Sequence, residues 1–455
     1  MQEMVIIDFI NKFVESKLNP AQVLALGFGG LILIGATLLN LPLASVDGKS
    51  IGFINSLFTA SSAVCVTGLV VVNTATHWSI FGKVVIILLI QMGGLGFMTM
   101  ATLVALILGK RITLKGRLLI QEGLNQLSLE GVVKLTKYVI ISTLVIEAIG
   151  AVLLSTRFIP IYGFKTGILF SIFHSISAFC NAGFDITGNS IVPFVGDFIV
   201  NITISILIII GGLGYTVYID VTTHKNLKKC SLHTKFVLFI TGILLLAGFI
   251  FFFIVEYTNP DTLGNLSFLE KIIASMFQSV VTRTAGFNSI DIGSISKATT
   301  FMMIILMFIG GSPSSTAGGI KTTTFGVIIL SIITVLKGKT DVEAFKKRIP
   351  NELIFRALAV VGIGLFLVIL VTMVLTLTEV DATFLDILFE TTSAFATVGL
   401  TRGITPDLSS LGKIILTFTM FAGRLGPLTL GFALAKKQDE YKGNYRYSEG
   451  KIIVG

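Results

Sequence analysis

Four short segments of the sequence share a pattern that suits cation binding. Each follows a short apolar stretch and ends on a glycine, and the residues just before that glycine are small or medium in size and uncharged. The segments are Val66-Thr67-Gly68, Asn181-Ala182-Gly183, Thr284-Ala285-Gly286 and Thr397-Val398-Gly399. Glycine reaches positive φ without a Cβ penalty, so such loops can offer backbone carbonyls to an ion in place of water. The lack of acidic residues favours a weakly hydrated monovalent cation, K+ first and Na+ as the alternative.

The four loop glycines recur at intervals close to a quarter of the 455-residue chain, which indicates a fourfold internal repeat. A second signature follows each of them in the next long apolar stretch: Gly93-Gly94-Leu95-Gly96, Gly211-Gly212-Leu213-Gly214, Gly310-Gly311-Ser312-Pro313 and Gly423-Arg424-Leu425-Gly426. Each repeat is expected to contain a helix, a short re-entrant helix, a glycine-bearing loop and a second helix. Helix C-termini carry about half a negative charge, so four short helices aimed at one axis would favour a cation there.

The third repeat contains a segment that cannot continue as a regular helix, because it combines a proline with four glycines. This segment, the gate loop, covers residues 310–322: Gly310, Gly311, Ser312, Pro313, Ser314, Ser315, Thr316, Ala317, Gly318, Gly319, Ile320, Lys321 and Thr322. We interpret it as a gate below the cation site; the alternative is a kink that lets helices pack closely. It is not a phosphate-binding loop, because Ile320 separates Gly319 from Lys321.

Charged residues within the apolar stretches are candidates for function. We expect Arg424 to face the cavity under the loops, to bond to the gate loop and to oppose cation leak; the alternative is an ion pair with a buried acid such as Glu147. Lys321 either lines the inner cavity or extends to the cytoplasmic interface. Arg283 is expected to brace its own loop through backbone carbonyls. Cys65 and Cys180 share one repeat position; we expect apolar fillers behind the loops, with a redox role as the alternative.

Composition places these loops in a membrane protein. Hydrophobic residues make up 53% of the chain and charged residues 13%, against about 25% charged in a typical soluble domain. That balance excludes a soluble globular enzyme, a disordered chain and a nucleic-acid binder. Eight stretches are long enough to span a bilayer as helices: 21–43, 79–108, 134–156, 196–221, 233–256, 298–335, 351–378 and 410–435. Four shorter ones should be re-entrant: 53–65, 167–180, 268–282 and 384–396.

The expected fold is therefore an all-α polytopic membrane protein with eight transmembrane helices. Four pseudo-repeated helix–pore helix–helix units would surround one central pore. The expected divisions are 1–20 as a cytosolic N-terminal segment, 21–109 as repeat 1, 110–223 as repeat 2 with its preceding cytosolic linker, 224–337 as repeat 3 with the gate loop, 338–436 as repeat 4 with its preceding cytosolic linker, and 437–455 as a cytosolic C-terminal tail.

Lysine and arginine concentrate in the N-terminal segment, in the linkers near 110–137, 224–235 and 337–356, and in the tail after 435. The positive-inside rule places these parts in the cytoplasm, so the chain is expected to be a multi-pass protein of the cell membrane with both termini inside. The net charge of +9 then records topology and gives no sign of a nucleic-acid partner.

The pattern resembles the membrane subunit of Ktr-type potassium uptake systems, in the Trk/Ktr/HKT superfamily. The resemblance covers essentially the full length. It rests on the loop glycines, the Gly-Gly-Leu-Gly and Gly-Arg-Leu-Gly-Pro motifs, the segment 282–288 and the tail segment 443–447. It implies four membrane–pore–membrane units, filter glycines at Gly68, Gly183, Gly286 and Gly399, and a gate at the broken helix of the third repeat.

The same resemblance implies partners and ligands. It predicts a homodimer with one pore per protomer, seated among membrane lipids on a cytosolic ring of RCK-type nucleotide-binding regulatory subunits. ATP or ADP is expected on that ring and no cofactor on this chain. K+ is the expected transported ion and the only expected metal, bound at the filter, with Na+ as a further option as activator.

Two other functions compete with a gated, channel-like potassium pathway. The first is a Na+/K+ symporter or a Na+-permeable relative. Each loop has a single glycine and none reads Thr-Val-Gly-Tyr-Gly, which implies fewer ordered carbonyl rings and looser discrimination between ions. Symporters often use inverted repeats, whereas these four repeats share one orientation. An intramembrane enzyme is the second; the sequence has only four histidines and no Gly-x-Ser-x-Gly or His-Glu-x-x-His motif, so we expect no catalytic residues.

Overall fold

The apolar stretches fold as helices, the one secondary structure that satisfies backbone groups within a single segment away from water. The computed structural model describes residues 20–96, 99–100, 102, 117–118, 121, 132–426 and 429–431. Its helices are α2 (Pro20–Leu39), α3 (Phe53–Val64), α4 (Thr74–His77), α5 (Ile80–Leu95), α8 (Val132–Tyr162), α9 (Phe164–Phe179), α10 (Phe198–Leu213), α11 (Tyr215–His224), α12 (Leu232–Glu256), α13 (Phe268–Val281), α14 (Lys297–Phe308), α15 (Thr322–Leu336), α16 (Asn351–Thr378), α17 (Phe384–Ala396) and α18 (Ser410–Leu425), with short 3-10 turns η1 (Pro42–Ala44), η2 (Val192–Phe194) and η3 (Leu227–Lys229).

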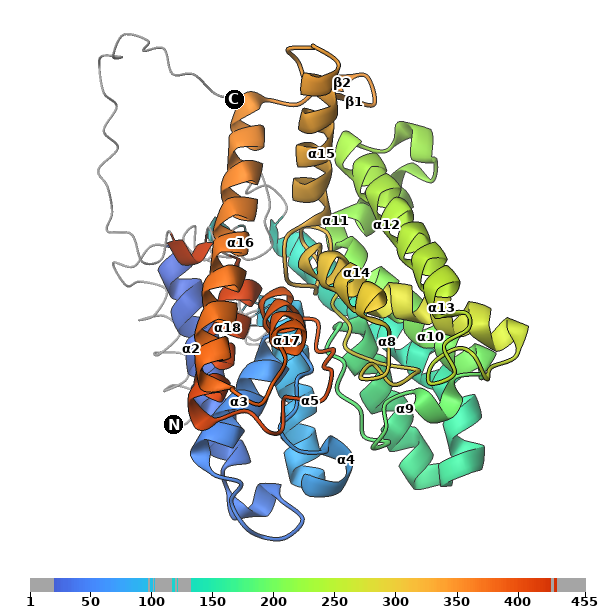
Figure 1. Cartoon of the computed structure of the whole chain (residues 1–455), viewed down its shortest axis with the longest axis vertical. Coiled ribbons are helices and arrows are strands. Elements are labelled where there is room, and N and C mark those ends of the chain that lie inside the picture. The colour runs from blue at the N-terminus through green and yellow to red at the C-terminus, as the bar shows by residue number, and fades with distance from the viewer. Residues whose placement is uncertain are drawn as a thin grey trace.

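Several expected segments lie outside the described residues. They are the N-terminal segment before Pro20, most of the linker that opens the second repeat, and the tail after residue 431, which includes the segment 443–447. The mostly helical fold is confirmed across the described part of the chain (Figure 1), where the strands are the two-residue β1 (Glu343–Ala344) and β2 (Lys347–Arg348).

The four short apolar stretches are helices, as expected. They form α3, α9, α13 and α17, and each is followed by one of the glycine-bearing loops. The starts of α13 and α17 are capped by side chains. Ser267 and Glu270 form a reciprocal capping box at α13, and the Thr383 hydroxyl accepts a hydrogen bond from the N–H of Asp386 at α17. The apolar pattern therefore predicted α3, α13 and α17 to within about one residue, whereas α9 begins at Phe164, before the expected residue 167.

The expected eight transmembrane helices are not confirmed. By length and apolar composition, four described helices could cross a membrane: α2, α8, α12 and α16. A fifth crossing exists if α10 and α11, which meet at an angle of 94°, are taken as one broken span. The second-signature glycines cause the breaks, because φ is 85° at Gly96, 91° at Gly214 and 84° at Gly426, and such left-handed residues end an α-helix.

The helices pack in a cyclic order that the chain sequence alone does not display. Each short helix lies against the long helix before it, in the pairs α2–α3, α8–α9, α12–α13 and α16–α17. The helix after each loop contacts the short helix of the next unit, in the pairs α5–α9, α10–α13 and α14–α17. Contact between α18 and α3 closes the cycle, so the first and last units of the chain are neighbours.

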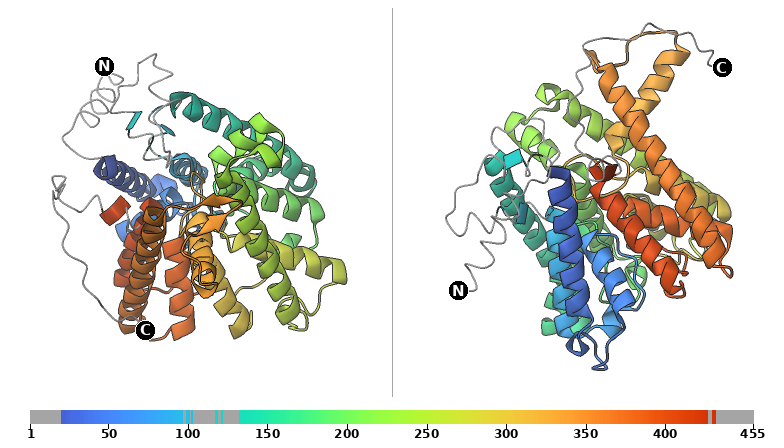
Figure 2. Two further views of the ribbon diagram at one scale, coloured as in Figure 1. Left: turned by 90° about the horizontal axis from the view of Figure 1, so that it is seen from above. Right: turned by 90° about the vertical axis from the view of Figure 1, so that its left-hand side faces the viewer.

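Helices α15 and α16 lie side by side and extend beyond the rest of the molecule, where β1 and β2 join them (Figures 1 and 2). The turn between the strands uses Phe345 and Lys346 at positive φ. Burial of Phe236 against Val342 and the strands anchors this arm to α12.

Candidate functional site

The four loops share a backbone conformation that the sequence pattern showed only in part. The loop glycines have positive φ, as expected: 95° at Gly68, 69° at Gly183, 68° at Gly286 and 89° at Gly399. The residue two places earlier is also left-handed: φ is 59° at Val66, 60° at Asn181, 67° at Thr284 and 51° at Thr397. Non-glycine residues rarely adopt this conformation, and strain of this kind clusters at functional sites.

Serine hydroxyls tie the first and fourth loops to the helices before them. The N–H of Gly68 donates to Ser62 Oγ at 3.0 Å, and the N–H of Gly399 donates to Ser393 Oγ at the same distance. The N–H of Thr67 and that of Val398 donate to helix carbonyls at 2.7 Å and 2.8 Å. The loop N–H groups are thereby occupied within their own unit, which leaves the loop carbonyls available to another ligand.

The four loop glycines form a closed ring. A Cβ atom added to Gly183 would lie 2.6 Å from the carbonyl oxygen of Ala285 in the next loop, and one added to Gly286 would lie 2.7 Å from that of Val398. Likewise, Gly68 abuts the carbonyl of Ala182, and Gly399 abuts that of Thr67. The four glycines and the four residues just before them are therefore brought together, and each glycine lets the carbonyl of a neighbouring loop approach.

A cavity of about 230 Å³ lies beside two of the ring glycines, Gly286 and Gly399. Asp291 and Arg402 are among its lining residues. The Arg402 guanidinium pairs with Asp386 at 2.6 Å, so its charge is balanced within the wall. Both side chains follow a loop glycine by a few residues, and neither is among the expected filter residues.

The gate loop is non-helical up to Lys321, as expected, with Thr322 beginning α15, and its two ends pair with each other. The N–H of Gly310 donates to the carbonyl of Ile320 at 2.9 Å, and the N–H of Ile320 donates to that of Phe308 at 3.3 Å. Backbone bonds tie the loop to the junction of α10 and α11: from Ser312 N to Gly212 O (2.9 Å), from Thr316 N to Gly211 O (3.2 Å) and from Tyr215 N to Ser314 O (2.9 Å). The backbone groups of the gate loop thus form hydrogen bonds with the second repeat instead of the bonds of a regular helix.

Arg424 bonds to the gate loop, as expected. Its Nη1 donates to the carbonyl of Thr316, while Nη2 donates to the carbonyls of Gly93 at 2.5 Å and Gly94 at 3.2 Å. Among the described residues no ion pair joins Arg424 to Glu147, whose carboxylate accepts a bond from Gln91 at 3.2 Å. The arginine therefore links the gate loop of the third repeat to the broken helix of the first.

Asn181 connects the ring to the gate loop through its side chain. Its Oδ1 accepts a hydrogen bond from the Thr316 hydroxyl at 3.2 Å, and that hydroxyl also lies 3.2 Å from the carbonyl of Phe179. The Nδ2 atom donates to the carbonyl of Arg283 and to the hydroxyl of Thr284, both at 3.4 Å. From the sequence, Asn181 was expected to contribute only its backbone carbonyl to the ion site. The hydrogen bond between its side chain and Thr316 was not predicted.

Other singled-out residues have local partners. Arg283 bonds to backbone carbonyls, as expected, and these belong to other elements: its guanidinium donates to the carbonyls of Thr241 on α12 and Gly310 in the gate loop, both at 3.4 Å. Lys321 donates to the carbonyl of Ala317 at 2.7 Å, within the gate loop. Cys65 and Cys180 are free, fully buried thiols, which fits apolar fillers.

Comparison with known proteins gives one consistent family. The sequence profile of the TrkH family, described as cation transport proteins, matches residues 32–444. The Ktr system potassium uptake protein B of Bacillus subtilis is 48% identical over 96% of this chain and 97% of its own. The potassium/sodium uptake protein NtpJ of Enterococcus hirae is 44% identical over 98% of this chain and 99% of its own.

A solved structure supports the fold. The crystal structure of the potassium transporter TrkH from Vibrio parahaemolyticus matches with a TM-score of 0.73 at 17% identity, covering 92% of this chain and 86% of that one. With a family profile over most of its length and full-length relatives far above 30% identity, the chain belongs to the TrkH family of cation transport proteins, which are membrane transporters and not enzymes.

Proposed function

We propose that this protein is the ion-translocating subunit of a potassium uptake system, in which K+ passes through the ring of loop glycines. The observation that carries the proposal is the closed ring of loops. In it, each loop glycine lies against the backbone carbonyl of the residue that precedes the glycine of a neighbouring loop. Short helices α3, α9, α13 and α17 end at these loops, and their C-terminal dipoles favour a cation. Relatives named as potassium uptake proteins support K+ as the ion.

Sodium permeation is the second candidate. The relative from Enterococcus hirae is named a potassium/sodium uptake protein, and each loop here contributes one glycine, which leaves fewer ordered carbonyl rings than a longer filter. On this alternative Na+ would pass with K+, or be coupled to it as in a symporter. Na+ acting only as an activator is a further variant of the same hypothesis.

We propose four membrane–pore–membrane units around one central pathway, with the broken helices completing eight crossings. The basic linkers and both termini then face the cytoplasm. The gate loop and Arg424 would close the pathway below the ring. A cytosolic RCK-type ring that binds ATP or ADP would control them in a homodimeric membrane subunit, and the names of Ktr-system relatives agree with a multi-component system.

Ion flux through purified protein in liposomes tests the proposal. We expect passive K+ flux down an imposed gradient, with a lower Na+ flux and no fixed ratio between the two ions. Strictly stoichiometric uptake of Na+ with K+ would favour the symporter. Equal passage of both ions would favour the Na+-permeable alternative, and the absence of any cation flux would contradict the proposal.

The Thr316→Val substitution tests whether the bridge through Asn181 couples the gate loop to the ring. It removes the hydroxyl that bonds to Asn181 and nearly preserves the shape of the side chain. One net hydrogen bond contributes about 1 kcal/mol, so we expect the K+:Na+ flux ratio to change by roughly fivefold. The matched control is Ser315→Ala, because the Ser315 hydroxyl bonds within the gate loop itself, to the carbonyl of Ser312 at 2.6 Å. Equal effects of the two substitutions would argue against the coupling.

A further inference from the structure

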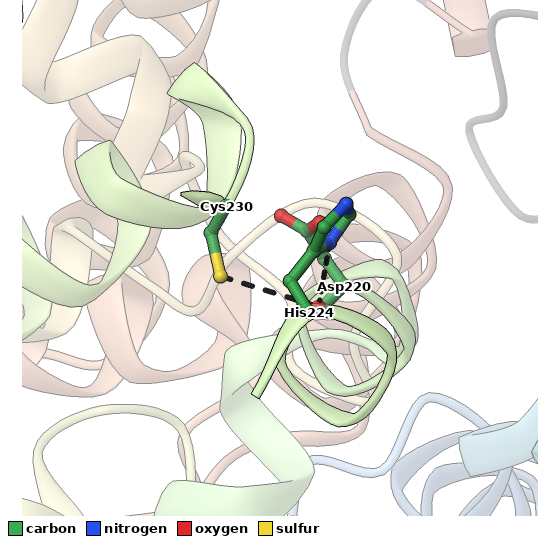
Figure 3. Close-up of side chains that lie close together, drawn as sticks. All are labelled: Asp220, His224 and Cys230. Atoms are coloured by element: carbon green, nitrogen blue, oxygen red, sulfur yellow. Dashed lines mark hydrogen bonds and ion pairs between the residues drawn. The ribbon is translucent and has the colours of Figure 1, made fainter. Parts of the chain in front are cut away.

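Three side chains of different ligand chemistry converge where α11 turns towards α12. Asp220, His224 and Cys230 each contribute one ligand atom, and these atoms lie within 4.8 Å of one another. Asp220 and His224 stand one turn apart on α11, and Cys230 faces them from the segment after η3 (Figure 3). We propose that this trio, the α11 turn cluster, binds a transition-metal ion of the Zn2+ class.

The geometry of the cluster is close to that of a metal site. His224 Nδ1 lies 2.8 Å from Asp220 Oδ1, and no two of the three ligand atoms are more than 4.8 Å apart, while Cys230 Sγ donates to the carbonyl of Asn226 at 3.4 Å. Ligand atoms held at about 2.0–2.3 Å by a tetrahedral ion are about 3.3–3.8 Å apart. Shifts of about 1 Å would therefore bring all three groups into coordination, which side-chain rotation and the short turn around Cys230 can supply.

The ligand set selects the class of ion. Imidazole and thiolate suit Zn2+ and its neighbours, whereas Mg2+ and Ca2+ prefer oxygen ligands alone. The His224 side chain is 44% exposed, which leaves room for a water ligand at a fourth position. The thiol of Cys230 is buried, with the residue only 5% exposed, so it is shielded from bulk water on the opposite side of the cluster.

Further contacts hold the carboxylate in place. Asp220 Oδ2 accepts hydrogen bonds from the N–H of Ser231 at 2.8 Å and from the hydroxyl of Thr234 at 2.5 Å, at the start of α12. Partners of this kind orient metal ligands and contribute strongly to affinity. They also give Asp220 a structural role without metal, as a cap on α12, and the experiment below separates the two roles.

The surrounding charge argues against a cation bound by attraction alone. Lys225, Lys228, Lys229 and Lys235 lie in the same connection, and they repel any cation that offers no coordinate bond. A Zn2+ ion would be held by the carboxylate, the imidazole and the thiolate that remains when Cys230 releases its proton on binding. The two negative ligands then balance the charge of the ion.

Metal binding at the α11 turn cluster would affect the gate loop, because α11 connects the two. The first N–H of α11, on Tyr215, donates to the gate-loop carbonyl of Ser314 at 2.9 Å, and the preceding Gly214 abuts the carbonyl of Pro313. An ion that fixes the far end of α11 to the start of α12 would hold this contact in place. This step depends on the proposed function, and it predicts that the metal slows ion flux.

Binding is tested with Co2+ as a spectroscopic probe on the purified full-length protein. We expect a thiolate-to-cobalt charge-transfer band in the near ultraviolet with one ion per chain. Cys230→Ser should abolish that band, and His224→Gln should weaken binding roughly tenfold or more. His77→Ala, at the end of the distant α4, is the control and should bind as the unmodified protein does. Absence of the band, or equal binding by the His224 and Cys230 variants and the control, would overturn the site and leave Asp220 as a helix cap only.

Flux measurements test the coupling separately. Zn2+ added on the side of α11 should lower K+ flux several-fold in the unmodified protein and in the His77→Ala variant, with little effect on His224→Gln. Binding without any change in flux would overturn the link to the gate loop. Absence of K+ flux even without metal would count against the proposed function, while the Co2+ spectra would still decide the metal site.

Discussion

Replacing Arg424 with alanine is expected to raise K+ flux through the protein in liposomes about tenfold or more when no regulatory subunit is present. The substitution removes the donor that joins the carbonyl of Thr316 in the gate loop to those of Gly93 and Gly94. It also removes a positive charge beside the proposed pathway. A cation about 8 Å away would be repelled by about 2 kcal/mol at an effective dielectric constant of about 20, which is roughly thirtyfold.

Two further variants separate charge from bonding at this position. Arg424→Lys keeps the charge but lacks the planar fork that reaches three carbonyls, so it should give an intermediate flux. Lys165→Ala removes an exposed cation far along the chain from the gate loop and should leave flux unchanged. Size-exclusion profiles would show whether each variant remains folded. An Arg424→Ala protein that is folded but retains low flux would contradict a gating role.

Replacing Gly183 with alanine is expected to reduce K+ uptake at least tenfold. Its φ of 69° costs a residue with a Cβ about 1–2 kcal/mol. The added Cβ would also lie 2.6 Å from both the carbonyl oxygen of Ala285 and Gly286 Cα, which is closer than real Cβ contacts. The neighbouring loop would have to move, so its carbonyls would leave the positions proposed for ion binding. The measurement is K+ flux, together with the K+:Na+ flux ratio.

A glycine elsewhere in the chain offers the matched control for Gly183. Gly30 lies within α2, where an added Cβ meets nothing within 4 Å. Alanine is also the better helix former, so Gly30→Ala should express and transport as the unmodified protein does. Uptake by Gly183→Ala equal to that of the Gly30 variant would place the ion pathway away from the ring of glycines.

The sequence alone determined the parts of this protein that depend on local pattern. Apolar length set the positions of the short helices α3, α9, α13 and α17, and the recurring glycines marked the loops that follow them. Pro313 and its neighbouring glycines identified the gate loop, because no regular helix accommodates them. These features can be read without the fold because each is encoded within about one helix length.

The contacts between repeats were decided only by the tertiary structure. Arg424 bonds to Gly93 across 331 positions of the chain, and Thr316 bonds to Asn181 across 135, because the last unit packs beside the first and the gate loop folds against the second. For the same reason, the sequence could predict that Arg283 bonds to backbone carbonyls but not that they belong to Thr241 and Gly310. The glycine motif indicated a bend at Gly214, but only the structure shows that its left-handed φ turns the helix by 94° there. A residue pattern shows which groups need a partner, whereas only the closed packing of the units shows which partner is within reach.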